Sequence, residues 1–197
     1  MKTEIKTFLF TIMLTAVFLS CSKNDEEQII DEERIIYQEQ NFFNGFLDQL
    51  GFTEAEFGSY GYPFQFGLSF TPLVDGTINS FVAYVPYEEP YGSIKLWEKS
   101  TGMLVYSKDL NLPENYELTV NVDPISLSKD KEYIITLYAL ASNFRYNFSF
   151  PNADLPIVEG DIQINYFTDS GHRDEMPSAV YSNFYYGDLS FNFQRTQ

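Results

Sequence analysis

The chain has 197 residues, of which 18% are aromatic, and carries a formal net charge of −16 at pH 7. Such acidity argues against nucleic-acid binding, because the phosphate backbone requires clustered Lys and Arg side chains. It equally disfavours attachment to anionic lipid through a basic patch. With one cysteine and one histidine, the chain is poorly equipped for a zinc site, and the sequence predicts no cofactor.

The first 20 residues have the pattern of a cleaved secretory signal. Two lysines precede a hydrophobic run at residues 8–19, and about 12 apolar residues are too few to span a bilayer as a helix. A short apolar core that ends at a small residue, here Ser20, is typical of signal peptides. The only cysteine, Cys21, follows at the place where a bacterial lipoprotein carries its lipid. We therefore predict a signal peptide at residues 1–20 and lipidation of Cys21.

Residues 21–34 are polar and acidic, and they cannot bury enough apolar area to order themselves. We interpret them as a lipidated tether. The sequence Ser-Lys-Asn-Asp-Glu-Glu at residues 22–27 resembles the tag that routes Bacteroidetes lipoproteins to the outer face of the outer membrane. Phe18 stands where most lipoprotein signals have Leu, a departure that signals of this group tolerate. The predicted location is the outer membrane, with the cell surface favoured over the periplasmic face.

Apolar residues next recur at helical spacing. Phe43, Phe46, Leu47 and Leu50 would lie on one face of a helix, and Gly51 is a suitable residue to end it. The sequence predicts a short amphipathic helix within residues 35–51, packed on the domain that follows.

From residue 52 to residue 197 the pattern is that of short strands. Residues 64–70 alternate with a period of two, as in a half-buried strand, and Pro72 ends the run. Further strands are predicted at residues 77–85, 93–98, 103–108, 116–122, 132–140, 144–150, 161–167 and 189–194. Such a series without intervening helices predicts an all-β fold, a single antiparallel β-sandwich of the jelly-roll or Ig-like kind.

Several motifs in this region occur together at a familiar spacing. They are FGLSFTP at 66–72, DGTI at 75–78, LW at 96–97 and STGML at 100–104. With the strand at 133–138 and the closing YYGDLSF at 185–191, they resemble the bacterial β-sandwich family catalogued as domain of unknown function 4082. The likeness covers about residues 50–195 and departs at 86–92, where longer members carry a Gly/His-rich segment. It implies a β-sandwich and no assigned activity.

The acidic loop after residue 168 is the place where metal or catalytic chemistry would be sought. Asp169, Asp174 and Glu175 could offer oxygen ligands to calcium, although an ordinary charged loop is the alternative. Ser170 and His172 lie beside these acids, but closeness in sequence does not make a catalytic triad. We expect the loop around His172 to be solvated.

Tyrosines form two dense groups that are candidates for ligand binding. Tyr84, Tyr87 and Tyr91 flank residues 88–90, and Tyr181, Tyr185 and Tyr186 surround Phe184. A tyrosine ring with its polar tip suits contact with sugars, peptides or protein partners. The alternative is that these rings cap the ends of the sandwich. The single tryptophan, Trp97, is interpreted as a core anchor.

These features favour a lipid-anchored envelope protein whose sandwich is a non-catalytic binding or adhesion module for a glycan or a protein. One alternative is an accessory structural subunit of an outer-membrane protein complex. Another is a hydrolase whose acids the sequence does not single out. A glycan-binding face should expose aromatic side chains around a groove, whereas a complex subunit should show an apolar patch or an open strand edge.

Overall fold

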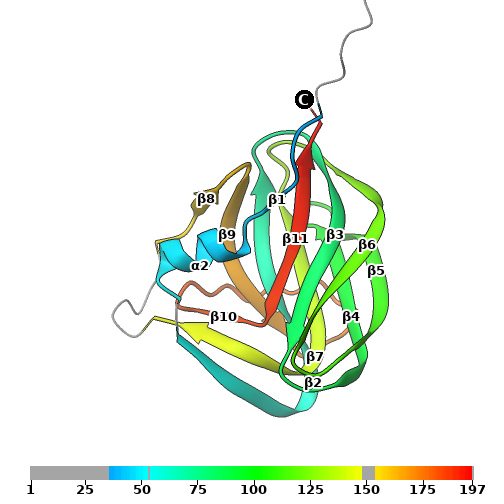
Figure 1. Ribbon diagram of the computed structural model, residues 1–197, viewed down its shortest axis with the longest axis vertical. Helices are drawn as coiled ribbons and strands as arrows, with labels where there is room; N and C mark the ends of the chain where they lie inside the picture. The colour runs from blue at the N-terminus through cyan, green and yellow to red at the C-terminus, as the bar shows by residue number, and fades with distance from the viewer. Residues whose placement is uncertain (1–35, 53, 148–153, 197) are drawn as a thin grey trace, which may run out of the picture. The chain divides into compact units, whose positions relative to one another are not determined.

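Antiparallel strands account for most of the computed structural model, which describes residues 36–52, 54–147 and 154–196 (Figure 1). The predicted signal peptide, Cys21 and the acidic tether lie outside the described residues. The smaller sheet has the order β1-β11-β3-β6, with β1 at Gln40–Asn41, β11 at Asp188–Arg195, β3 at Gly76–Val85 and β6 at Tyr116–Leu127.

The larger sheet has the order β5-β4-β7-β2-β9-β8, and β10 pairs with β7 off this path. Its strands are β5 at Met103–Leu112, β4 at Glu89–Glu98, β7 at Tyr133–Tyr146, β2 at Glu54–Pro72, β9 at Ile162–Ser170, β8 at Ile157–Glu159 and β10 at Phe184–Tyr186. The two sheets pack face to face around one hydrophobic core, which confirms the predicted all-β sandwich (Figure 1).

The core is built from the inward side chains of strands that alternate as the sequence indicates. Phe66, Leu68 and Phe70 of β2 are fully buried, and the ring of Phe70 lies 4.5 Å from that of Phe191 in the opposite sheet. Complete burial of side chains of this size contributes about 1.5–3 kcal/mol each to the hydrophobic driving force. These aromatic contacts between the sheets hold the sandwich together.

Trp97 is buried, as predicted for a core anchor, but it is not part of the main core. Its side chain is 6% exposed, while the preceding Leu96 belongs to the cluster between the sheets. Successive strand residues point to opposite faces, so Trp97 lies on the outer face of the larger sheet. Its Nε1 donor has no hydrogen-bond partner in the described part of the chain.

The helix α2 occupies Phe43–Leu50 and closes one open side of the sandwich, where it lies between β8 and β11 (Figure 1). Phe46, Leu47 and Leu50 are its buried residues. The helix ends at Gly51, which adopts the left-handed conformation with φ 63°. The predicted helix and its end are therefore present.

The predicted helical range is too long at its start, because residues 36–42 are not helical. Residues 40–41 instead form β1, which pairs with β11, and Ile36 is 82% exposed. The Asn41 side chain explains the change, because its amide donates to Asn192 Oδ1 at 2.9 Å and its own oxygen accepts from the N–H of Phe43 at 3.0 Å. These bonds hold the chain extended up to the first helical turn.

Three predicted strands also differ from those observed. The strands expected at 132–140 and 144–150 are one strand, β7, which continues through Tyr146, and residues 148–150 lie outside the described residues. The observed β2 begins at Glu54, well before the predicted start at residue 64. A register shift between Ser59 and Phe64 divides β2 into two parts. The early part of β2, the end of β7 and β10 form an extension of the larger sheet.

Candidate functional site

The first tyrosine group does not form a single surface. Tyr87 and Tyr91 are 52% and 75% exposed, whereas Tyr84 is half-buried on β3 and its hydroxyl donates to Asn115 Oδ1 at 2.9 Å. Between them, Glu89 is buried and belongs to β4. Its carboxylate accepts from the N–H of Leu140 at 2.6 Å and ties the start of β4 to β7.

In the second tyrosine group, the assignment of Tyr185 to ligand binding is wrong. Tyr185 is 0% exposed, because its ring packs between α2 and β9. Its hydroxyl donates to the carbonyl of Leu189 at 2.7 Å and accepts from the Leu189 N–H at 3.1 Å. Burial raises the pKa of Tyr185 far above its ordinary value. This ring fixes the turn at Gly187, where φ is 84°.

Tyr181 and Tyr186 are half-buried and stack on other rings. Both contact Phe184, with ring centroids 4.6 Å and 4.9 Å away, and Tyr186 also lies 5.1 Å from Phe144. Both rings thus pack on neighbouring rings, as the capping alternative expects, and a ligand role for these two residues stays a prediction.

The three acids considered for calcium do not converge. Asp169 accepts from the hydroxyl of Tyr181 at 3.2 Å, and burial raises its pKa. Asp174 instead pairs with Lys95 at 2.6 Å, and this hydrogen bond lowers the pKa of Asp174. Within the described ranges, no three His, Cys, Asp or Glu side chains gather closely enough to hold a metal ion. The calcium assignment is therefore contradicted.

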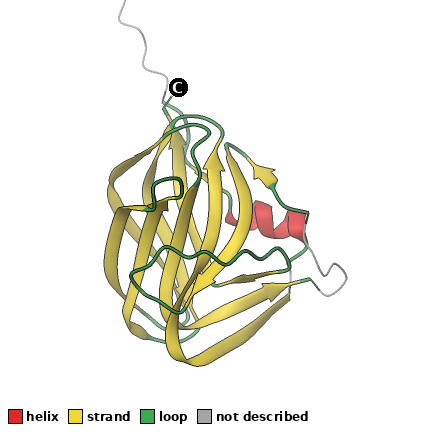
Figure 2. Ribbon diagram, turned by 180° about the vertical axis from the view of Figure 1, so that it is seen from behind, coloured by secondary structure: helices red, strands yellow, loops and turns green. Residues whose placement is uncertain are grey.

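The loop that carries these acids, residues 171–181, crosses the outer face of the larger sheet, and we call it the strap (Figure 2). Buried polar side chains of the sheet hold it. Lys95 donates to the carbonyl of Arg173, Gln65 donates to those of His172 and Glu175, and Thr168 donates to that of Ala179. His172 is exposed, as are Asp174 and Glu175, so the loop is solvated as expected, while its backbone carbonyls are held by the sheet beneath it.

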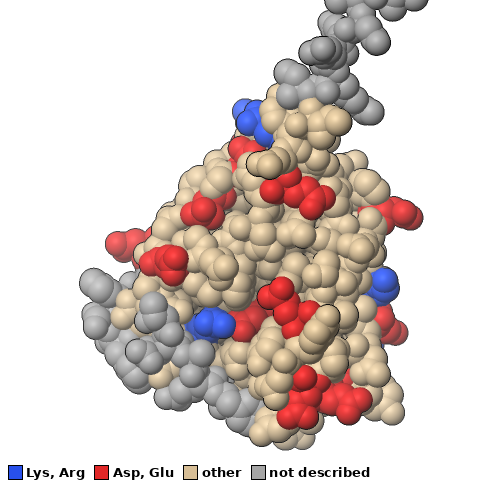
Figure 3. All heavy atoms as spheres, viewed as in Figure 1, with Lys and Arg blue, Asp and Glu red and all other residues tan. Residues whose placement is uncertain are grey.

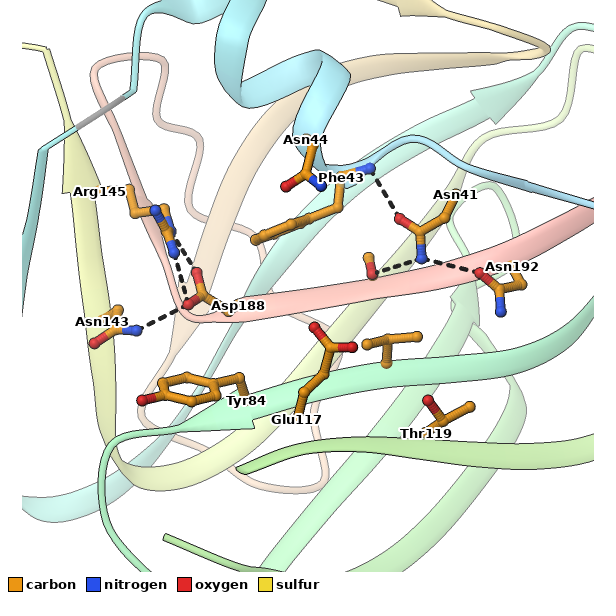
Figure 4. A pocket seen from close by; sticks show the side chains of 12 residues that line it. Asn41, Phe43, Asn44, Tyr84, Glu117, Thr119, Asn143, Arg145, Asp188 and Asn192 are labelled. Carbon is orange, nitrogen blue, oxygen red and sulfur yellow. Dashed lines mark hydrogen bonds and ion pairs between the residues drawn. The ribbon is translucent and has the colours of Figure 1, made fainter. Parts of the chain in front are cut away.

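A polar groove lies on the other side of the sandwich, on the outer face of the smaller sheet (Figure 4). It has a volume of about 620 Å³ and is lined from β1, α2, β3, β6, β7 and β11. We call it the outer groove. Of the tyrosines predicted to bind a ligand, only Tyr84 lines it.

The floor of the outer groove follows directly from strand alternation. The inward residues of β3, β6 and β11 are apolar, so the intervening polar residues point outward. Strand pairing then aligns the outward residues in rows across β11, β3 and β6, namely Asp188, Tyr84 and Glu117 in one row and Ser190, Thr119 and the apolar Val82 in the next. Residues more than 100 positions apart in sequence therefore share one surface.

Two sets of hydrogen bonds fix the walls of the outer groove. On one side Asn41 bridges to Ser190 Oγ at 3.3 Å and to Asn192 Oδ1 at 2.9 Å. On the other side Asp188 accepts from Arg145 through both oxygens, with Nη2 to Oδ2 at 2.8 Å, and from Asn143 at 2.8 Å. The hydrogen bonds from Arg145 to Asp188 raise the pKa of Arg145, which remains charged. The ion pair is mostly shielded from solvent.

Other polar groups in the outer groove are left available. In the part of the chain that the structure describes, the side chains of Asn44, Glu117 and Thr119 form no hydrogen bond or ion pair. They stand on opposite sides, Asn44 on α2 and the other two on β6 (Figure 4). The rings of Phe43 and Tyr84 complete the lining. The outer groove thus combines a rigid frame with free donors and acceptors, as ligand sites commonly do.

The sequence contained a weak signal for this site. Polar residues at the outward positions of 80–84, 117–121 and 188–192 are ordinary for a solvated sheet face, and nothing in one strand identifies its neighbours. The decisive pair, Arg145 with Asp188, joins positions 43 residues apart. Only the register of β11 on β3 and the end of β7 shows that they meet.

Two carboxylates in the outer groove bear on the hydrolase alternative. Glu117 and Asp188 belong to one row and are two strands apart, or about 10 Å between backbones. A glycosidase, however, needs a carboxyl that burial keeps neutral so that it can donate a proton. Glu117 is exposed, and both oxygens of Asp188 are engaged by Arg145 and Asn143. The arrangement favours binding over catalysis.

Comparison with known proteins adds no further identification. The chain matches none of the models of known protein families, and no curated protein is significantly similar to it. The likeness to domain of unknown function 4082 therefore rests on its motifs and stays a prediction.

Proposed function

We propose that this is a lipid-anchored protein of the bacterial outer membrane whose β-sandwich is a non-catalytic binding module, with the outer groove as its ligand site. The observation that carries the proposal is the groove itself, in which Asn44, Glu117 and Thr119 remain free within a frame fixed by hydrogen bonds. Ligands of the two expected kinds, a glycan or a protein of the envelope, both suit a polar, preformed surface of this size.

Binding can be tested with the chain lacking residues 1–20 and carrying Cys21→Ser, applied to a glycan array and to envelope extracts. We expect saturable binding that the double variant Asn44→Ala/Thr119→Ala weakens about 5- to 150-fold, since each substitution removes a hydrogen bond of about 0.5–1.5 kcal/mol. Ser126→Ala, on the same strand as Thr119 but lining neither the outer groove nor the second cavity, is the matched control. Binding that all three chains share equally would place the ligand elsewhere.

The anchor is proposed from the sequence of residues 1–21. No helix among the described residues is long and apolar enough to cross a membrane. Cys21→Ala should move the protein from the membrane fraction to the soluble fraction, because stable attachment requires two or more acyl chains. Cys21→Ser is the matched second variant and should behave alike. Membrane fractionation unchanged by both substitutions would contradict lipidation.

The alternative, an accessory subunit of an outer-membrane complex, has one structural feature in its favour. Strands β5 and β6 are at the edges of their sheets, and Leu104 and Tyr116 on them are exposed. A second cavity of about 700 Å³ lies between these strands, beside Tyr106 and Ile125. Capture of an envelope protein that Leu104→Lys abolishes, while the groove variants leave it intact, would favour this alternative.

A further inference from the structure

We infer that the outer groove recognises an uncharged saccharide and that Glu117 is its specificity-determining residue, accepting hydrogen bonds from two neighbouring hydroxyls and rejecting anionic sugars. The inference rests on the proposed function and names the ligand class of the same site. It follows from the charge of the groove, from the kinds of polar groups in it and from its aromatic rings.

Charge is the first consideration. Asp188 and Arg145 neutralise each other, so the carboxylate of Glu117 gives the outer groove a net negative charge. The same face of the molecule carries many Asp and Glu side chains and few Lys or Arg (Figure 3). With −16 on the whole chain, the surrounding potential is also negative. An anionic ligand would be repelled by the charge of Glu117 and by the surrounding potential, whereas an uncharged ligand would meet no such repulsion.

The polar groups distinguish a sugar from a basic peptide. A basic peptide requires several carboxylates, and Glu117 is the one unpaired carboxylate that lines the outer groove in the described structure. The remaining free groups, the amide of Asn44 and the hydroxyl of Thr119, can donate and accept alike. Sugar hydroxyls have the same dual capacity. A carboxylate presents two oxygens that match two adjacent hydroxyls of a ring, and such charge-assisted bonds are the stronger ones.

The rings provide the apolar part of the site. Phe43 is half-buried and held in place by Phe46 at 5.5 Å and by the guanidinium of Arg145, 5.7 Å from the ring centroid. Tyr84, in the floor of the outer groove, is fixed by the hydrogen bond from its hydroxyl to Asn115. A sugar ring has apolar C–H faces between its hydroxyls, and a fixed aromatic ring covers such a face without losing conformational freedom. Glu117 lies next to Tyr84 in the same row.

The test compares matched sugars on the chain lacking residues 1–20 and carrying Cys21→Ser. An array of neutral hexasaccharides of glucose, mannose, galactose and xylose identifies a ligand for titration calorimetry. Oligogalacturonate and its methyl ester then present one backbone with and without charge. We expect wild-type protein to bind neutral sugars and Glu117→Gln to bind them roughly 10- to 100-fold more weakly, as for loss of a charged acceptor. Glu117→Gln should also reduce the ratio between the affinity for the methyl ester and the affinity for the charged oligogalacturonate.

Asp123→Asn is the matched control, because it removes one exposed carboxylate from the same strand outside the outer groove. Its sugar binding and its melting temperature should equal those of the wild type. Equal binding of charged and uncharged sugars, or full retention of affinity in Glu117→Gln, would overturn the inference and leave the binding module in place. If no sugar binds and the protein instead captures an envelope protein that the groove variants fail to hold, the saccharide inference is likewise overturned while the binding module stands. Binding unaffected by any groove variant would overturn the proposed function as well.

Discussion

Gly67→Ala is expected to lower the free energy of unfolding by about 2–4 kcal/mol. Gly67 lies in the middle of β2, with Thr136 of β7 on one side and Thr168 of β9 on the other. A methyl group there would come within 2.9 Å of the carbonyl carbon of Ile135 and of Cα of Thr136, and closer still to the Ile135 oxygen. These are backbone atoms of a central strand, so they cannot turn aside as a flexible side chain can.

The melting temperature of the variant should fall by roughly 5–15 °C in a chain of this size. Gly171→Ala is the matched control, because no heavy atom lies within 4 Å of its added methyl group and its φ is not in the left-handed region. Gly171 begins the strap rather than a strand. If both variants have the melting temperature of the wild type, the close approach of β2 and β7 at Gly67 does not exist in solution.

The fold could be predicted from the sequence because its strongest signal is local. The alternation at residues 64–70 places three aromatic rings on one face, and that face is buried. The ends of elements were predictable where one residue forces them, as Pro72 does for β2 and Gly51 for α2. The early part of β2 was missed because its pairing with the end of β7 is a long-range interaction. Likewise, β1 exists because Asn41 finds partners on β11, about 150 residues away.

The candidate site was predictable only in part, because composition identifies tyrosines but not their environment. Tyr84 and Tyr185 both come from tyrosine-rich segments, yet one lines the outer groove and the other is in the core. Position on the strand face makes the difference, since Tyr84 alternates with the buried Ala83 and Val85. The free side chain of Glu117 carries no sequence signal at all. It acquires significance only through the register that sets it beside Tyr84.

Asp188→Ala should both destabilise the protein and abolish binding in the outer groove. The Asp188 side chain is 10% exposed and that of Arg145 is 21% exposed, so removal of the carboxylate leaves a poorly solvated positive charge without its partner. Breaking a fully buried pair costs about 3–5 kcal/mol, and the partial exposure of Arg145 reduces the expected loss to about 2–3 kcal/mol. Asn143 loses its acceptor as well. Chemical denaturation and sugar titration on the same preparation measure the two effects.

A double substitution separates the ion pair from the shape of the outer groove. Arg145→Met/Asp188→Leu replaces both charges with apolar groups, and such replacements are often neutral in stability. We therefore expect the double variant to recover most of the stability that Asp188→Ala loses, while binding stays lost because the frame around Asn143 is apolar. Asp188→Asn keeps one acceptor for Arg145 or Asn143, so its stability should lie between those of the wild type and Asp188→Ala. A double variant as unstable as Asp188→Ala would show that the cost lies in packing rather than in the unpaired charge. Normal sugar binding by the double variant would show that the ion pair is no part of the site.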